Sequence, residues 1–270
     1  MNKLVVVFTA LLLLNFKVVG QSSNFPIEKE AAIKALFDKY LEMGIPGLAI
    51  SVYSEATGMW SHAAGYANLE NKIPLTEEHV HYLQSVSKTY MAVAILKLFE
   101  QGKIDLDATI DNYLETPFVN SIKGANKVTV RMLLNHTSGL PEYSTEPRLV
   151  SRIIHHPNKL LTVEEMLHYI EDLPMEFEPG SQYKYRNTNY EVLSLIADKI
   201  TGDHVAYINK IIINKLKLKH TYYLTSDNYL DNMNLVDSYW DILLEGIPVN
   251  VSGMQKANVC LLYTSDAADD

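Results

Sequence analysis

The spacing of hydrophobic and polar residues predicts a helix and then a β-hairpin near the start of the chain. From Ile27 to Met43 apolar residues recur at the spacing of an amphipathic helix, and Gly44 is a suitable residue just past its end. Two strand-like segments follow, Leu48 to Tyr53 and Met59 to Ala67, and the turn at 55–58 ends in glycine. Because a lone hairpin is only marginally stable in water, these strands need further partners.

A strongly hydrophobic segment, around which the rest of the chain is organised, runs from Gln84 to Gly102. Between Tyr90 and Phe99 every residue except Lys97 is apolar, and such a helix is expected to be buried on nearly all sides. The best later helix candidates are 128–135, 162–172, 189–201 and 204–215. The pattern predicts an α/β (α+β) fold, in which an antiparallel sheet is flanked by helices and a helical region is inserted at about 88–225.

Composition and charge restrict the class of protein. The 270 residues suffice for one large domain or two ordinary ones, and 47% hydrophobic with 20% charged residues is typical of a globular protein. The formal net charge is −9 and no basic patch is evident, which argues against a nucleic-acid partner.

The N-terminal segment has the pattern of a signal peptide. Lys3 supplies the positive start, Leu4 to Leu14 form the apolar core, and Val18 and Gly20 are small enough for cleavage before Gln21. The apolar run is too short to span a bilayer, and no cysteine follows it to carry a lipid. We therefore expect export to the periplasm or the medium and no stable membrane anchor once residues 1–20 are removed.

The C-terminal segment 260–270 resembles translated read-through rather than part of the domain. It is short and acidic, and it shows no strand alternation. We therefore expect the domain to cover 21–259 and to be incomplete. Cys260, the single cysteine of the chain, lies in this segment, so no disulfide or thiol chemistry is expected.

A possible nucleophile stands at the entrance of the hydrophobic helix. Ser85 and Lys88 are three residues apart, so one helical turn brings their side chains to the same face. A lysine is rarely buried without a partner, and a desolvated lysine can act as a general base toward a neighbouring hydroxyl. Ser85 is therefore a candidate nucleophile and Lys88 its candidate base.

Other arrangements of reactive residues are weaker candidates. The Ser-x-x-Lys pattern recurs at Ser181 and Lys184, but in a polar turn where a solvated lysine is the simpler interpretation. The chain has no Gly-x-Ser-x-Gly and no His-Glu-x-x-His. The adjacent His155 and His156 lack a third ligand at a recognisable spacing, so we expect no metal and no cofactor.

A second polar group occurs at Tyr185 and Asn187. A phenol near an ammonium group can relay a proton, and an amide can hold a substrate carbonyl. The structural alternative is that Tyr185 packs and Asn187 caps the helix that begins here. Tyr207 and Asn209 repeat the spacing inside a predicted helix, so the spacing alone is weak evidence.

Three segments of the chain carry a recognisable combination of motifs: Ser85 to Thr89, Leu133 to Pro141 and Phe177 to Asn187. Together they resemble the serine β-lactamase-related hydrolases, the family of class C β-lactamases, D-alanyl-D-alanine carboxypeptidases and penicillin-binding esterases. The resemblance extends from about Ile27 to Leu224. It implies a β-lactamase/transpeptidase-like fold with the site in a cleft between its two parts.

The resemblance also implies roles for the candidate residues. Ser85 would be the acylated nucleophile, Lys88 its base and Tyr185 the proton relay. Asn187 would bind the substrate's amide or orient Lys88. The loop that contains His136 would be structural and would brace the site.

Two features depart from the family pattern. The middle residue of the tyrosine motif, usually small, is Arg186, which could crowd the pocket or favour an anionic substrate, although a solvated arginine is the simpler expectation. The third motif, a Lys- or His-led pair before glycine on a late strand, has no match here. We therefore expect the late sheet strands to be missing and the chain as written to be inactive.

The resulting hypothesis is an exported serine hydrolase that forms an acyl-enzyme on Ser85. Peptide-like amides, β-lactams and simple esters are all possible substrates. The alternative is a non-catalytic penicillin- or peptidoglycan-binding protein that keeps the same pocket, and a covalent probe distinguishes the two.

Overall fold

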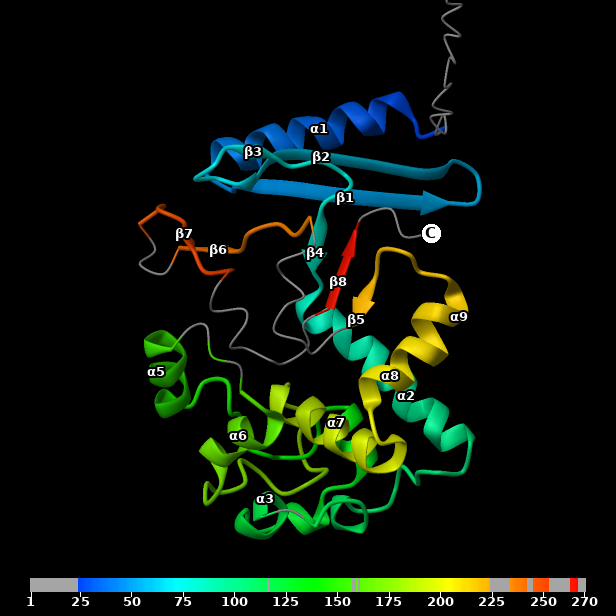
Figure 1. The fold of residues 1–270 in the computed structure, drawn as a ribbon, viewed down its shortest axis with the longest axis vertical. Helices are drawn as coiled ribbons and strands as arrows, with labels where there is room; N and C mark the ends of the chain where they lie inside the picture. The colour runs from blue at the N-terminus through cyan, green and yellow to red at the C-terminus, as the bar shows by residue number, and fades with distance from the viewer. Residues whose placement is uncertain are drawn as a thin grey trace, which may run out of the picture.

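The computed structural model describes residues 24–115, 117–156, 159, 161–223, 234–241, 245–252 and the backbone of 263–266. The signal peptide predicted at 1–20 lies outside these residues, as does most of the segment 260–270. Figure 1 shows a layer of helix and sheet at one end of the molecule and a group of helices at the other.

The helix and the hairpin predicted from the first hydrophobic pattern are both confirmed. Helix α1 (Ile27–Glu42) lies over an antiparallel pair of strands, β1 (Gly47–Ser54) and β2 (Gly58–Asn68), as Figure 1 shows. The buried Phe37 of α1 packs against His62 of β2 with ring centroids 5.0 Å apart. The short β3 (Ile73–Pro74) adds a third strand next to β2.

The sequence predicts that the late strands of the sheet are missing, and the described residues in the later part of the chain form only short strands. The structure has short strands β5 (Tyr222–Tyr223), β6 (Tyr239–Trp240), β7 (Val249–Asn250) and β8 (Tyr263–Asp266). Strand β8 lies between β4 (Val80–Tyr82) and β5, so the C-terminal segment does contain a strand, contrary to expectation. Among the described residues, none of these late strands joins the sheet of β1 and β2.

The hydrophobic segment after β4 differs from its prediction in two ways. Ser85 lies in a 3₁₀ turn, η1 (Gln84–Ser87), and helix α2 (Lys88–Glu100) begins only at the lysine. Helix α2 is buried on one face only, because Leu96 and Phe99 remain 44% and 45% exposed. The expectation of burial on nearly all sides is therefore wrong, although the opposite face packs into the core.

The helical part follows α2 and contains most of the core. It includes two helices that the sequence pattern did not indicate, the short α3 (Pro117–Ser121) and also α5 (Pro147–His155), in which Leu149 and Ile153 form the buried face. The remaining helices are α4 (Val130–Leu134), α6 (Val163–Leu167), α7 (Asn187–Thr201), α8 (His204–Ile208) and α9 (Asn214–Leu216). Short 3₁₀ turns lie at η2 (Ile110–Asn112), η3 (Ala125–Lys127) and η4 (His168–Ile170), and a π-helical turn, η5 (Asn209–Ile213), joins α8 to α9.

Helix α7 connects this core to the candidate site. Its residues from Thr188 to Ser194 are all buried, and it packs against α2 and α4. Helix α2 begins at Lys88 and α7 begins at Asn187, and a hydrogen bond joins these two residues. The packing of two apolar helices therefore brings two polar N-terminal residues together.

Candidate active site

Ser85 and Lys88 lie side by side where the 3₁₀ turn meets helix α2. The Lys88 Nζ is 3.4 Å from the Ser85 Oγ, and Lys88 is buried while Ser85 is exposed. Gln84, immediately before the serine, has a φ of 50°, a left-handed conformation that is strained for a residue with a side chain. The Ser87 hydroxyl donates a hydrogen bond to the Gln84 carbonyl and holds this turn.

Tyr185 reaches the same serine from a distant part of the chain. Its phenol donates a hydrogen bond to the Ser85 Oγ at 2.8 Å. The Lys88 Nζ lies 5.2 Å from the centre of the Tyr185 ring and 5.7 Å from that of Tyr190. An ammonium group over aromatic faces is attracted by their electron density, so both rings help to hold the lysine in place.

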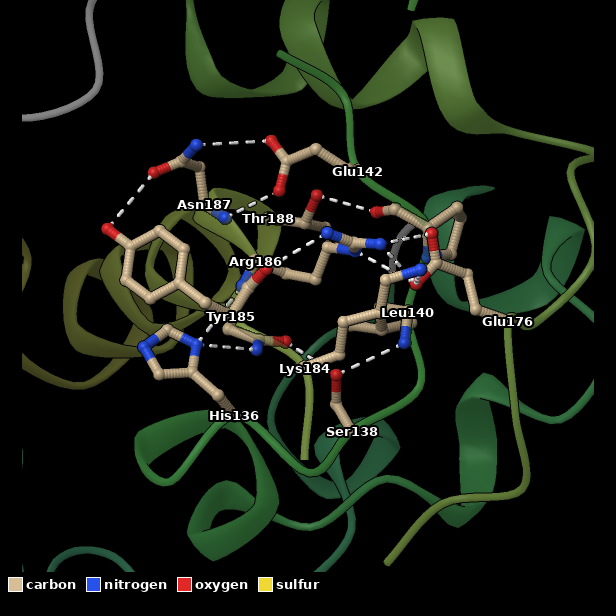
Figure 2. Close-up of polar contacts among 12 residues, drawn as sticks. His136, Ser138, Leu140, Glu142, Glu176, Lys184, Tyr185, Arg186, Asn187 and Thr188 are labelled. Carbon is tan, nitrogen blue, oxygen red and sulfur yellow. Dashed lines mark hydrogen bonds and ion pairs between the residues drawn. The ribbon is translucent and has the colours of Figure 1, made fainter. Parts of the chain in front are cut away.

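Asn187 completes the group of predicted residues. Its Oδ1 accepts a hydrogen bond from Lys88 Nζ at 3.0 Å and lies 3.4 Å from the Tyr185 hydroxyl. Its Nδ2 points the other way, toward Glu142, as Figure 2 shows. The structure therefore brings all four residues predicted from the sequence into one cluster.

A loop that begins at His136 braces the segment before Tyr185. Backbone N–H groups of 176, 180 and 184 donate to carbonyls of Gly139, Thr137 and His136 at 2.8, 2.8 and 2.9 Å. Gly139 has a φ of 77°, and a Cβ there would lie 2.2 Å from the Phe177 carbonyl oxygen, so a side chain cannot fit.

His136 lies behind Tyr185 as a neutral acceptor. Its Nδ1 receives the Arg186 N–H at 3.3 Å and the Asn189 Nδ2 at 3.0 Å, and its ring centre is 4.5 Å from that of Tyr185. Burial, and then the charge of Lys88, lower the pKa of His136 below its ordinary value. The structural role expected for this loop agrees with these contacts.

The titration of His136 gives a prediction about stability. Because the pKa of His136 is lowered in the folded state, the unfolded chain binds the proton more readily. Neutral His136 therefore contributes to the free energy of unfolding. This contribution is complete above the unfolded-state pKa of about 6.5 and is lost as pH falls through the folded-state pKa. When the pH is lowered from 7.5 to 5, the melting temperature should therefore fall less in His136→Asn than in the parent. The exposed His156→Asn is the control, and equal slopes in the parent and His136→Asn contradict the prediction.

The sequence suggested that Arg186 would be solvated, and the structure contradicts this. Arg186 also does not line the site as a free cation. Its guanidinium pairs with Glu176 at 2.7 Å, and its side chain is only 17% exposed (Figure 2). Lys184 also contacts Glu176, at 3.2 Å, and Ser181 donates to the carbonyl of Glu178. The second Ser-x-x-Lys pair therefore has structural partners of its own.

Sequence reasoning missed Glu142 and Ser144, which contact Asn187. The Glu142 carboxylate accepts from the Asn187 backbone N–H at 2.6 Å, and the Ser144 hydroxyl lies 3.2 Å from Asn187 Nδ2. Glu142 follows directly on the predicted motif that ends at Pro141, and its position there was the one available signal.

A large cavity lies away from these residues. It is open to solvent, has a volume of about 480 Å³ and is lined by residues of α3, α5, α6 and α7, among them Phe118, Leu167 and Leu195. Across the described ranges, no helix has the length and apolar character needed to cross a bilayer. The same ranges contain no group of three or more His, Cys, Asp or Glu side chains that could hold a metal ion.

Comparison with known proteins identifies the family of the chain. The family model described as Beta-lactamase matches residues 33–228. The chain therefore belongs to the beta-lactamase family. It is 36% identical over 110 residues to the serine beta-lactamase-like protein LACTB, mitochondrial, of Homo sapiens, which covers 40% of this chain and 20% of that protein. It is also 25% identical over 197 residues to Protein flp of Staphylococcus aureus (strain MW2), covering 72% of this chain and 38% of flp.

Solved structures show the same fold. The D-amino acid amidase from Ochrobactrum anthropi SV3, complexed with L-phenylalanine amide, aligns with a TM-score of 0.75 at 23% identity, covering 88% of this chain and 67% of that one. The octameric penicillin-binding protein homologue from Pyrococcus abyssi aligns with a TM-score of 0.72 at 25% identity, covering 90% and 55%. The β-lactamase/transpeptidase-like fold predicted from the sequence is thus confirmed.

Proposed function

We propose that this protein is a serine hydrolase in which Ser85 carries an acyl group during the reaction. The observation that carries the proposal is the contact of Ser85 Oγ with both Tyr185 OH and Lys88 Nζ. A hydroxyl flanked by a phenol and a buried amine has a nearby base and a route for its proton. Membership of the beta-lactamase family supports the same class of reaction.

The geometry supports a particular sequence of proton transfers. For this reaction Lys88 must be in its uncharged form, in which its amine takes the proton of Ser85 while Oγ attacks the carbonyl carbon of the substrate. When the tetrahedral intermediate collapses, the bond to the leaving nitrogen or oxygen breaks. Tyr185 donates a proton to the leaving group and recovers one from Lys88. Water then attacks the acyl-enzyme by the reverse route and releases the acid.

Amides, β-lactams and esters of peptide-like acids are the proposed substrates. Ser85 is exposed and Tyr185 is 41% exposed, so an acyl donor can approach from solvent. Similar structures include a D-amino acid amidase and EstCE1, a hydrolase with promiscuous acyltransferase activity. The same fold serves different substrates in these proteins, so the acyl group must be identified by assay.

We also propose export, on the basis of the charged start and apolar core of residues 1–20.

A non-catalytic binding protein with the same pocket is the alternative function. It would bind a β-lactam or a peptide reversibly without forming an adduct on Ser85.

Stopped-flow hydrolysis of a p-nitrophenyl ester, with mass spectrometry of the quenched protein, tests the proposal. The printed sequence and the same chain extended by the C-terminal part of a relative are assayed in parallel, because the third family motif has no match here. A burst of nitrophenol together with an acyl adduct on the Ser85 peptide is expected from the extended chain. Reversible binding without a burst or adduct in either chain would favour the alternative.

Replacing the tyrosine should discriminate between leaving groups. Tyr185→Phe removes the hydroxyl that lies 2.8 Å from Ser85 Oγ but keeps the ring beside Lys88. Because p-nitrophenolate departs without protonation, ester hydrolysis should fall by only about tenfold, less than the 10²–10⁴ typical of general acid–base catalysis. The matching anilide should lose more. Equal losses for the ester and the anilide would exclude Tyr185 as the donor to the leaving group.

A further inference from the structure

Glu142 forms three hydrogen bonds behind the proposed catalytic residues. One oxygen of its carboxylate accepts the Asn187 backbone N–H at 2.6 Å. The other accepts the Asn187 Nδ2 at 3.3 Å and the Ser144 backbone N–H at 3.0 Å. Figure 2 shows Glu142 on the side of Asn187 opposite Tyr185.

These contacts determine which way the Asn187 amide faces. A carboxylate can only accept hydrogen bonds, so the side of the amide that faces Glu142 must be its NH₂ group. The Ser144 hydroxyl, 3.2 Å away, lies within reach of the second hydrogen of the same nitrogen. The amide oxygen therefore points toward Lys88 Nζ and the Tyr185 hydroxyl.

We propose that Glu142 is a positioning residue for the reaction: it fixes the Asn187 amide so that Oδ1 holds Lys88 in line with Ser85. This inference rests on the proposed function. Asn187 was expected either to bind the substrate's amide or to orient Lys88, and the inference selects the second role. The reason is that an Nδ2 already engaged by Glu142 and Ser144 is not free to bind a substrate carbonyl. Asn187 then orients the lysine.

Glu142 has a structural role as well, which the experiment must separate from positioning. Asn187 is the first residue of α7, and its N–H has no acceptor within the helix, so the carboxylate also stabilises the helix N-terminus. A variant that only loosened this end would lower the fraction of folded protein. A variant that misplaced Lys88 would slow the reaction in molecules that are folded.

Burst kinetics measure these two quantities separately. The burst amplitude counts competent sites, and the burst rate constant reports acylation within them. Glu142→Gln keeps the size of the side chain and one acceptor for the Asn187 N–H, but its NH₂ group can no longer accept from the Asn187 Nδ2 or from the Ser144 N–H. In the chain form that shows a burst, we expect the acylation rate constant to fall roughly tenfold, the effect of one charged hydrogen bond. The amplitude and the melting temperature should stay near those of the parent.

A structural control lies at the same junction. Thr188 donates to the Pro141 carbonyl at 2.6 Å and accepts from the Tyr143 N–H at 3.2 Å, without a side-chain contact to the Asn187 amide. Thr188→Val should lower the melting temperature and leave the acylation rate constant unchanged. If Glu142→Gln instead behaves like Thr188→Val, or matches the parent in rate constant, the positioning role is wrong.

A double-mutant cycle tests whether Glu142 acts through Asn187. In an Asn187→Ala background the Glu142→Gln change should have little further effect on the acylation rate constant, because the amide that it orients is gone. Additive effects would overturn the inference while leaving the acyl-enzyme intact. Absence of both a burst and an acyl adduct in both chain forms would overturn the proposed function, and the role of Glu142 with it.

Discussion

Ser85→Ala is expected to abolish covalent labelling by a fluorescent penicillin or fluorophosphonate, with no residual band above background. The probe must form a bond to an oxygen nucleophile, and Ser85 is the serine whose hydroxyl contacts both Tyr185 and Lys88. Loss of the nucleophile removes the acyl-enzyme itself, so this is the largest effect that the site predicts. Gel fluorescence and peptide mapping measure it in the chain form that labels.

Ser181→Ala is the matched control, because Ser181 begins the second Ser-x-x-Lys pattern. Its hydroxyl donates to the Glu178 carbonyl at 2.6 Å, and its lysine pairs with Glu176. This variant should keep the label at the parent's intensity. Labelling that survives Ser85→Ala, or that disappears in Ser181→Ala, would move the nucleophile elsewhere.

Lys88→Arg should slow acylation by at least ~10², the lower end for loss of general-base catalysis. The substitution keeps the positive charge, but a guanidinium cannot accept a proton at neutral pH. The lysine is only 6% exposed and its Nζ sits 3.0 Å from Asn187 Oδ1, so a larger head group also displaces its neighbours. Single-turnover acylation by the chromogenic ester measures the effect.

Lys184→Arg makes the same chemical change in the other Ser-x-x-Lys pair. Lys184 is exposed and contacts Glu176 at 3.2 Å, a contact that arginine can also make. The acylation rate of the Lys184→Arg variant should stay within threefold of the parent. This corresponds to a change in activation free energy of less than ~0.7 kcal/mol. A Lys88→Arg variant that is equally fast would show that Lys88 has a structural role only.

The sequence predicted the elements whose hydrophobic pattern is regular. Helix α1 and the β1–β2 hairpin appear close to their expected bounds, because one face of each packs against the other. Helix α2 shows where this reasoning fails. Its residues from Tyr90 to Phe99 are all apolar except Lys97, but which face becomes buried depends on which elements lie next to the helix, and composition does not specify them.

The site was predictable only as far as local spacing and resemblance reach. Ser85 and Lys88 lie within one turn, and Tyr185 and Asn187 within three residues, so each pair could be found from sequence. Glu142 could not, because it is 45 residues from the amide that it contacts. Arg186 was expected in solvent because no local pattern pairs it with Glu176. The loop at His136 brings the segment with Glu176 close to Arg186, and this is a tertiary contact.

The two halves of the site are far apart in the order of synthesis. Ser85 is separated from Tyr185 by 100 residues, and Lys88 from Asn187 by 99. Because a chain is made from its N-terminus, the serine and the lysine exist for many seconds before the phenol and the amide, at about 5–20 residues per second. During that interval Ser85 is an ordinary serine on an unfinished chain. On the proposed function, reactivity is therefore acquired late, once α7 has been made and has packed against α2.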